Sequence, residues 1–204
     1  MKGRSDGDGR MGRSDGGNLM PAFPNPYADA VARLRVPSGF LIVLVFALFS
    51  HPTAPSLELG LPVSVAGLAL RAWAAGCLAK DQRLAKGGPY AHTRNPLYLG
   101  TLLVAAGLAI AARSPWLGAL FGAVFVLVYL PVIQLEEQHL RRLFPDYGAF
   151  ADRVPALWPR LRAVQDAGAQ RFRWALYVKN REYQAAMGFA AGAGFLLWRL
   201  LWRL

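Results

Sequence analysis

Residues 87–100 read Gly-Gly-Pro-Tyr-Ala-His-Thr-Arg-Asn-Pro-Leu-Tyr-Leu-Gly and form a short polar stretch between two long apolar runs. The two glycines and Pro89 end any helix that precedes them. Pro96 suits the first turn of a new helix, because the N–H group that proline lacks would be unsatisfied there anyway, and Asn95 stands at the position of an N-cap. The stretch therefore predicts a helix that begins at Pro96, with polar and aromatic side chains gathered beside apolar surface.

The apolar residues on either side come in blocks rather than in amphipathic stripes, which indicates helices that cross a membrane. Hydrophobic residues make up 54% of the 204 residues, a high fraction for a soluble protein. Block lengths near that of a membrane span predict an all-α, integral membrane helical bundle of about five membrane segments. The predicted segments are residues 36–50, 57–79, 96–112, 116–135 and 183–198.

The length is that of one domain, with a separate N-terminal tail. Residues 1–26 are rich in Gly, Asp, Ser and Arg and predict a disordered tail. Residues 27–204 are predicted to form the membrane domain, which begins with a short interfacial helix over residues 27–35. In the last apolar segment, Gly188 and Gly192 have the spacing of small residues that pack closely against another helix.

The net charge is +11, and the cations concentrate in the segments 80–95 and 138–182. The positive-inside rule then predicts a multi-pass protein of the inner membrane with both segments facing the cytoplasm. Membrane lipids are expected partners, whereas nucleic acid is not, because its binding needs a basic face on a soluble fold. A metal site is not expected either, since the three histidines lack a spacing that suits one.

Two sequence blocks carry a resemblance to a known family. Gly-Pro-Tyr and Arg-Asn-Pro-Leu-Tyr-Leu-Gly within residues 88–100 resemble the first signature of the isoprenylcysteine carboxyl methyltransferases, which are grouped with the phospholipid methyltransferases. Glu-Glu-Gln-His-Leu at 136–140, followed by Phe-Pro-Asp-Tyr and Arg-Val-Pro, resembles the second signature, in the same order. Asn95 stands where many members have histidine, and Pro145 where many have glycine. The resemblance implies an integral-membrane, S-adenosylmethionine-dependent methyltransferase with a lipidic or amphipathic small-molecule acceptor.

Methyl transfer from a sulfonium ion needs the donor to be held, the acceptor to be aligned and water to be kept away. Arg94 is suited to hold a carboxylate at two points, and the aromatic rings of the first block offer faces to an adenine or a sulfonium cation. The resemblance implicates Glu136 and Glu137 in holding the donor. With Arg94 these two acids are the predicted catalytic residues, and the predicted cofactor-binding residues are Tyr90, His92, Asn95, Pro96, Tyr98, Gly100, Glu136, Tyr147 and Arg153.

Arg71 lies inside the second apolar run, where an arginine is expensive and by default marks a functional position. Snorkelling of its long side chain to the interface is the alternative. Arg71 and the nearby Trp73 are the predicted substrate-contacting residues. Glu137 also has a purely structural interpretation, in which the helix continues and Glu137 pairs with Arg141 one turn later. Residues 147–158 are interpreted as an amphipathic segment anchored on the membrane surface by aromatic side chains.

Two other functions stay open at this point. Sterol reductases are similar around Arg-x-Pro-x-Tyr-x-Gly, which would predict a membrane reductase that uses NADPH, although Thr101 stands where their acid usually follows the glycine. A non-enzymatic membrane protein could instead bind anionic lipid through its basic surface. The methyltransferase interpretation requires Arg94 and Glu136 to line one cofactor pocket on the cytoplasmic side.

Overall fold

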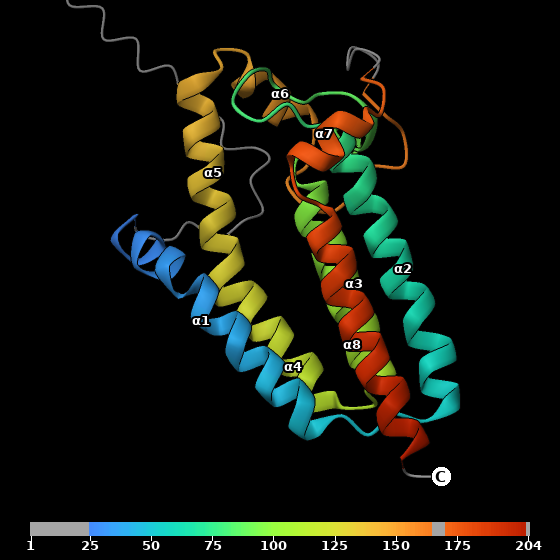
Figure 1. Cartoon of the computed structure of the whole chain (residues 1–204). Helices are drawn as coiled ribbons and strands as arrows, with labels where there is room; N and C mark the ends of the chain where they lie inside the picture. Colours follow the sequence, from blue (N-terminus) through green and yellow to red (C-terminus); the bar gives the residue numbers. More distant parts are fainter. Residues whose placement is uncertain (1–24, 165–169, 203–204) are drawn as a thin grey trace, which may run out of the picture.

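A computed structural model describes residues 25–164 and 170–202, and these residues form helices joined by loops, with no strand among them (Figure 1). A short 3₁₀ turn, η1 (Gly88–Ala91), precedes α3, and a π-helical turn, η2 (Phe125–Tyr129), joins α4 to α5 without a break. The all-α prediction is confirmed. The α-helices are α1 (Asn25–Phe49), α2 (Ala54–Cys77), α3 (Pro96–Ala111), α4 (Pro115–Val124), α5 (Leu130–Leu143), α6 (Tyr147–Arg153), α7 (Trp174–Lys179) and α8 (Tyr183–Leu201).

Within the described residues, three helical stretches are long and apolar enough to cross a membrane: Ala54–Cys77, Pro115–Leu143 and Tyr183–Leu201. Gly39–Phe49 and Pro96–Ala111 are apolar but shorter. All five predicted apolar segments are therefore helical, and three of them belong to stretches that, among the described residues, are both long and apolar enough to cross. The segment predicted to end at residue 135 differs most, because the helix runs on to Leu143 and so contains both acidic residues of the second block.

The first helix also departs from expectation. α1 is continuous from Asn25, so the predicted interfacial helix over residues 27–35 is not a separate element but the start of α1. The predicted disordered tail lies outside the described residues, apart from its last two positions, which are already helical. The last apolar segment forms one continuous helix, α8.

Figure 1 shows how this arrangement places the two sequence blocks. Helices α2, α3 and α8 run side by side, while α1 and the α4–α5 rod form the other limb of the molecule. The loop before α3, the end of α5, α6 and α7 all lie at one end of the bundle, and the connections 50–53 and 112–114 lie at the other. Both blocks therefore share one end of the molecule, and the assignment of that end to the cytoplasm stays a prediction.

Glycines bring the backbones of α2 and α3 into contact. A Cβ atom at Gly60 would lie 2.4 Å from the carbonyl oxygen of Gly107, and one at Gly67 would lie 2.7 Å from that of Gly100. Between them, Ser64 Oγ donates a hydrogen bond of 3.0 Å to a backbone carbonyl of α3. Small residues at such spacing allow close helix packing without a hydrophobic driving force between helices. This seam fixes the register of α3, whose first turn carries the first sequence block.

The predicted close packing around Gly188 and Gly192 is wrong. A Cβ atom at Gly188 would meet nothing within 4 Å, and one at Gly192 would come no closer than 3.9 Å to the side chain of Leu108. Helix α8 therefore packs through its larger side chains, with Leu196 fully buried beside Phe46 and Leu117.

We expect Gly107→Leu to lower the free energy of unfolding by about 3 kcal/mol, the upper end of the range for overpacked sites. Its new Cβ atom would lie 2.3 Å from Ser64 Oγ and 2.5 Å from the carbonyl oxygen of Gly60, and the latter, a backbone atom, cannot simply rotate away. Unfolding midpoints in detergent would measure the change. Gly188→Leu, which adds the same side chain where nothing lies within 4 Å, is the control; equal midpoints for the two variants would contradict the seam.

Candidate active site

A buried ion pair joins the first sequence block to α5. Arg94 Nε lies 3.0 Å from Glu137 Oε1, and the two side chains are only 3% and 9% exposed. Arg94 Nη1 donates to the carbonyl oxygen of Ala151 in α6 at 2.9 Å, and the Arg94 backbone N–H donates to that of Pro155, also at 2.9 Å. Arg94 thus ties the loop before α3 to α5, to α6 and to the segment that follows α6.

Glu137 gathers further donors from both blocks. Asn95 Nδ2 donates to Glu137 Oε1 at 3.2 Å and to the carbonyl oxygen of Ala156 at 3.0 Å. The Tyr147 hydroxyl hydrogen-bonds Glu137 as well, and burial, with this carboxylate beside it, raises the pKa of Tyr147 above its usual value. Asn95 does occupy the N-cap position of α3, but its side chain does not cap the helix, because its amide is directed to Glu137 instead.

The predicted alternative partner of Glu137, Arg141, is not the one that it has. The helix continues past Glu137, as that interpretation required, but Glu137 reaches across to Arg94. The Arg141 guanidinium lies over the Tyr147 ring, 5.4 Å from its centroid. The buried Glu137 therefore pairs with the buried Arg94, and the exposed Arg141 packs on the Tyr147 ring instead.

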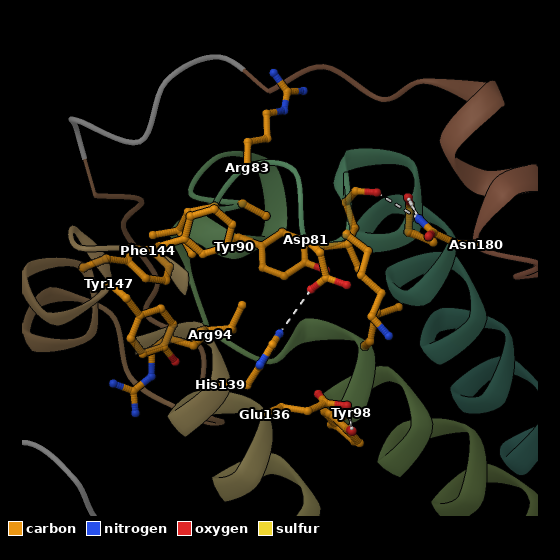
Figure 2. Close-up of a pocket in the computed structure, with 18 of the residues that line it drawn as sticks. Asp81, Arg83, Tyr90, Arg94, Tyr98, Glu136, His139, Phe144, Tyr147 and Asn180 are labelled. Carbon is orange, nitrogen blue, oxygen red and sulfur yellow. Dashed lines mark hydrogen bonds and ion pairs between the residues drawn. The ribbon is translucent and has the colours of Figure 1, made fainter. Parts of the chain in front are cut away.

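A cavity of about 650 Å³ opens beside this ion pair, at the end of the bundle that holds both blocks. This volume lies in the range of small-molecule sites. Its walls come from the end of α2, the loop after it, the start of α3, α5, α6 and the connection from α7 to α8 (Figure 2). Arg94 and Glu136 both line it, so the two blocks share one cavity. The sequence-predicted residues in its walls are Arg71, Tyr90, Arg94, Tyr98, Glu136 and Tyr147.

The two neighbouring acids have different surroundings. Glu136 is exposed and lines the cavity, where its Oε1 accepts a hydrogen bond of 2.9 Å from the Tyr98 hydroxyl. Glu137 is buried and holds the loop and α6 in place instead of facing the cavity. Glu136 is therefore the acid available to a ligand, whereas Glu137 positions the residues around it.

Tyr90 supplies a buried hydroxyl to the cavity wall. Its side chain is 6% exposed, and among the described residues its hydroxyl has no hydrogen-bond partner. Burial, together with anionic groups nearby that include Glu136, raises the pKa of Tyr90, so the hydroxyl stays protonated and can donate. A buried hydroxyl left unsatisfied costs about 1–3 kcal/mol, which a bound ligand with an acceptor atom would offset.

Arg71 lines the cavity, but its guanidinium is already engaged. Its Nε and Nη2 donate to the two carboxylate oxygens of Glu182 at 2.5 and 3.0 Å, and its Nη1 bonds the Leu97 carbonyl and the Thr101 hydroxyl. Arg71 therefore does not snorkel; it joins α2, α3 and the start of α8. Glu182 was not predicted as its partner, although it is the single acid among the basic residues just before the last apolar run.

Two predicted cofactor-binding residues serve helix packing instead. Pro96 is buried in the first turn of α3. Gly100 faces α2, where an added Cβ atom would lie 2.5 Å from Arg71 Cγ. The absence of a side chain at Gly100 thus allows α3 to approach α2 closely.

Three further predicted residues do not line the cavity. His92 is turned toward the segment after α6, with its Nδ1 2.7 Å from the carbonyl oxygen of Arg160. Arg153 is exposed at the end of α6. Trp73 is 45% exposed on the side of α2. His92 is held in this orientation because the backbone of residues 91–94 is hydrogen-bonded to the segment after α6.

The predicted surface anchor over residues 147–158 is largely buried. Tyr147, Phe150 and Val154 form a cluster in which Tyr147 and Val154 are 1% exposed, and the two aromatic residues line the cavity. Ala149, Asp152 and Arg153 are exposed on the opposite side, and Trp158 at the end of the segment is 73% exposed. α6 folds inward because the Arg94–Glu137 pair and the Ala151 carbonyl draw it onto the loop.

Sequence reasoning missed several polar residues in the cavity walls. Lys80, Asp81 and Arg83 belong to the loop directly before the first block, and His139 follows the two acids on α5. His139 Nε2 lies 3.6 Å from Asp81 Oδ1 (Figure 2). The density of charge in residues 80–86 was a usable signal, but nothing local indicated which of these side chains would face α5.

We expect Glu137→Ala to lower the free energy of unfolding by about 3–5 kcal/mol, because it leaves the Arg94 charge buried without its carboxylate. Glu136→Ala removes one exposed acceptor and should lower it by about 1 kcal/mol or less. Thermal or denaturant unfolding of the two purified variants in one detergent would measure the difference. Equal losses would show that the neighbouring acids do not have separate roles.

The sequence is similar to one protein family and to two metal resistance proteins. The family model described as phospholipid methyltransferase matches residues 62–147, a region that runs from α2 to the start of α6 and includes most of the cavity wall. A cobalt-zinc-cadmium resistance protein of Cupriavidus metallidurans is 35% identical over 124 residues, which cover 60% of this chain and 54% of the relative. A nickel-cobalt-cadmium resistance protein of Alcaligenes xylosoxydans xylosoxydans is 35% identical over 158 residues, covering 71% of this chain and 74% of the relative.

The matched region thus spans about half the length of the first relative and three quarters of the second. No solved structure matches the chain. Across residues 25–164 and 170–202, no group of three or more His, Cys, Asp or Glu side chains is placed to hold a metal ion.

Proposed function

Because the chain belongs to the phospholipid methyltransferase family, we propose that it takes a methyl group from S-adenosylmethionine and transfers it to a lipidic or amphipathic acceptor. The observation that carries the proposal is the shared cavity at one end of the bundle. Arg94 of the first block and Glu136 of the second both line it, although the chain between them crosses the bundle twice.

The residues of the cavity fit S-adenosylmethionine, which carries a sulfonium cation, an ammonium group, a carboxylate and an adenine. Glu136 and Asp81 offer carboxylates to its cationic groups, and Lys80 and Arg83 offer cations to its carboxylate. The tyrosine and phenylalanine rings of the walls suit both the adenine and the sulfonium cation. The Tyr90 hydroxyl is a buried donor that a ligand acceptor would satisfy.

When bound, S-adenosylmethionine supplies a methyl group on a positively charged sulfur, ready for an in-line displacement. The chain then needs to bind, orient and exclude water, and no protein-derived nucleophile is required. Glu136, oriented by Tyr98, presents negative charge to the cavity. Arg94, held by Glu137, fixes the loop that carries Tyr90 and so shapes the wall opposite α5.

An acceptor with an apolar part suits the remaining walls. The cavity lies where α2 and α8, two helices of spanning length, end and begin, so its rim adjoins the apolar bundle. The two relatives are named for metal resistance, and the proposed transfer requires no metal. The apolar residues of the cavity wall include Leu78, Leu84, Leu97, Leu135 and Leu140.

Calorimetric titration of the purified full chain in detergent would separate the three candidate functions. We expect S-adenosylmethionine to bind and NADPH not to bind. Binding of NADPH alone would favour the reductase, and binding of neither would favour a non-enzymatic lipid-binding protein. Mass spectrometry of lipid extracts incubated with isotopically labelled donor would then identify the acceptor.

Glu136→Gln should weaken binding of S-adenosylmethionine at least tenfold, because a hydrogen bond to a charged group contributes about 1.5–3 kcal/mol and about 1.4 kcal/mol is tenfold. The fold should be kept, since Glu136 is exposed and the substitution retains an acceptor for Tyr98. Glu58→Gln, which removes an exposed carboxylate near the start of α2 at the other end of the bundle, is the matched control. Unchanged binding in Glu136→Gln would count against the assigned site.

The same comparison is less informative for Arg94. Arg94→Ala would remove the other motif residue that lines the cavity. Because Arg94 is the buried partner of Glu137, its removal leaves an uncompensated carboxylate inside the protein. Loss of activity in that variant would therefore not distinguish a binding role from a folding role, and Glu136 provides the cleaner test.

A further inference from the structure

A basic and aromatic surface lies outside the cavity, on α7 and its flanks. We call it the α7 surface and define it by the exposed side chains of six residues. Phe172 and Trp174 are 45% and 66% exposed, and four cations alternate with them or follow them. Residues 170–181 contain no acidic residue. The α7 surface consists of Arg171, Phe172, Arg173, Trp174, Lys179 and Arg181.

The nearest acid along the chain does not neutralise this surface. Glu182 is buried, and both of its carboxylate oxygens accept hydrogen bonds from Arg71. Among the described residues, none of the four cations of the α7 surface forms an ion pair, and all four are exposed, so they present positive charge to the outside of the molecule.

The α7 surface is fixed to the last turn of α2. The Phe172 ring covers Gly76 so closely that an added Cβ atom would lie 2.1 Å from it, and the Arg173 backbone N–H donates to the Gly76 carbonyl oxygen at 2.9 Å. On the other flank, Asn180 Nδ2 donates to the carbonyl oxygens of Ala75 and Leu78, each at 2.9 Å. These contacts use the backbone, Phe172 and Asn180, and leave the four cationic side chains out of the packing.

Its place in the fold corresponds to the edge of a bilayer. α2 ends at Cys77 and α8 begins at Tyr183, and both helices are apolar and of spanning length. α7 lies across this end of the bundle (Figure 1). Trp174 stacks on Tyr177 with ring centroids 4.8 Å apart, and tryptophan and tyrosine gather at the level of lipid headgroups. Arginine and lysine at that level attract anionic lipids.

We infer that the α7 surface binds the headgroups of anionic phospholipids in the leaflet that surrounds this end of the bundle. Charge complementarity selects the anionic headgroup, and the exposed Phe172 and Trp174 select a lipid surface over a soluble polyanion. The inference does not depend on methyl transfer and would stand for a non-enzymatic protein of the same fold. It also places a bound headgroup beside the cavity, because Asn180 and Glu182 of the same segment line its wall.

Native mass spectrometry of the full chain, with phosphatidylglycerol and phosphatidylcholine of identical acyl chains added in equal amounts, tests the inference. We expect the protein to retain phosphatidylglycerol at least fivefold over phosphatidylcholine. The variant R171Q/R173Q/K179Q/R181Q should bring this ratio close to one while keeping the unfolding midpoint, because it changes only exposed side chains. The variant K2Q/R4Q/R10Q/R13Q, which removes the same four charges near the N-terminus, should retain the preference.

No preference in the unaltered chain would overturn the inference. An equal loss in the two quadruple variants would also overturn it, because net charge and not the α7 surface would then be responsible. If the α7 quadruple variant does not fold, R171Q/R173Q and K179Q/R181Q carry the test separately. Each should lower the ratio at least twofold, and a ratio unchanged in both would refute a headgroup site at α7.

Discussion

The Arg94–Glu137 ion pair is the constraint on which the site depends. It joins residues from the two sequence blocks in an almost water-free position, and Asn95, Tyr147 and a backbone carbonyl of α6 supply further hydrogen bonds around it. A buried pair is tolerated only when such additional partners satisfy both charges. The Arg94–Glu137 pair thus connects three parts of the cavity wall, namely the loop with Tyr90, helix α5 and helix α6.

This arrangement gives the paired acids distinct physical roles. Glu137 accepts hydrogen bonds from side chains of the protein itself. Glu136, one residue earlier on the helix, faces the cavity and accepts a hydrogen bond from Tyr98. A second ion pair, between Arg71 and Glu182, lies in another part of the cavity wall. The cavity is therefore flanked by two internally balanced pairs, and the charges offered to a ligand come from residues outside those pairs.

Much of the fold was predictable because apolar runs and turn residues act locally. The helix that begins at Pro96 and the family resemblance were both predicted correctly. The end of α5 was not, because Glu136 and Glu137 suggest a boundary by polarity, while the first true helix breaker after them is Pro145. The contact between α2 and α3 was also missed, since the glycines that make it are spread over two segments, whereas Gly188 and Gly192 give a more conspicuous pattern and meet almost nothing.

The residues of the cavity wall were only partly predictable, because local sequence patterns do not indicate which distant segments meet. Tyr98 and Glu136 stand in motifs whose helical context orients them, and Arg94 stands two residues before the helix that its motif begins. Asp81, His139 and Asn180 come from places whose meeting is decided by tertiary structure, and no local signal indicates it. His92 shows the converse, because a residue within the motif is turned outward by backbone hydrogen bonds to the segment after α6.

The glycine seam between α2 and α3 also limits how a membrane-dissolved molecule can travel. Where two helix backbones already touch, as at Gly60 and Gly107 and again at Gly67 and Gly100, no hydrocarbon tail can slip between them. That flank of the protein is closed to lateral diffusion from the bilayer. A molecule bound in the cavity must therefore place its acyl chain on another side of the bundle. The backbone contact between α2 and α3 in this way restricts the direction from which such a molecule can enter.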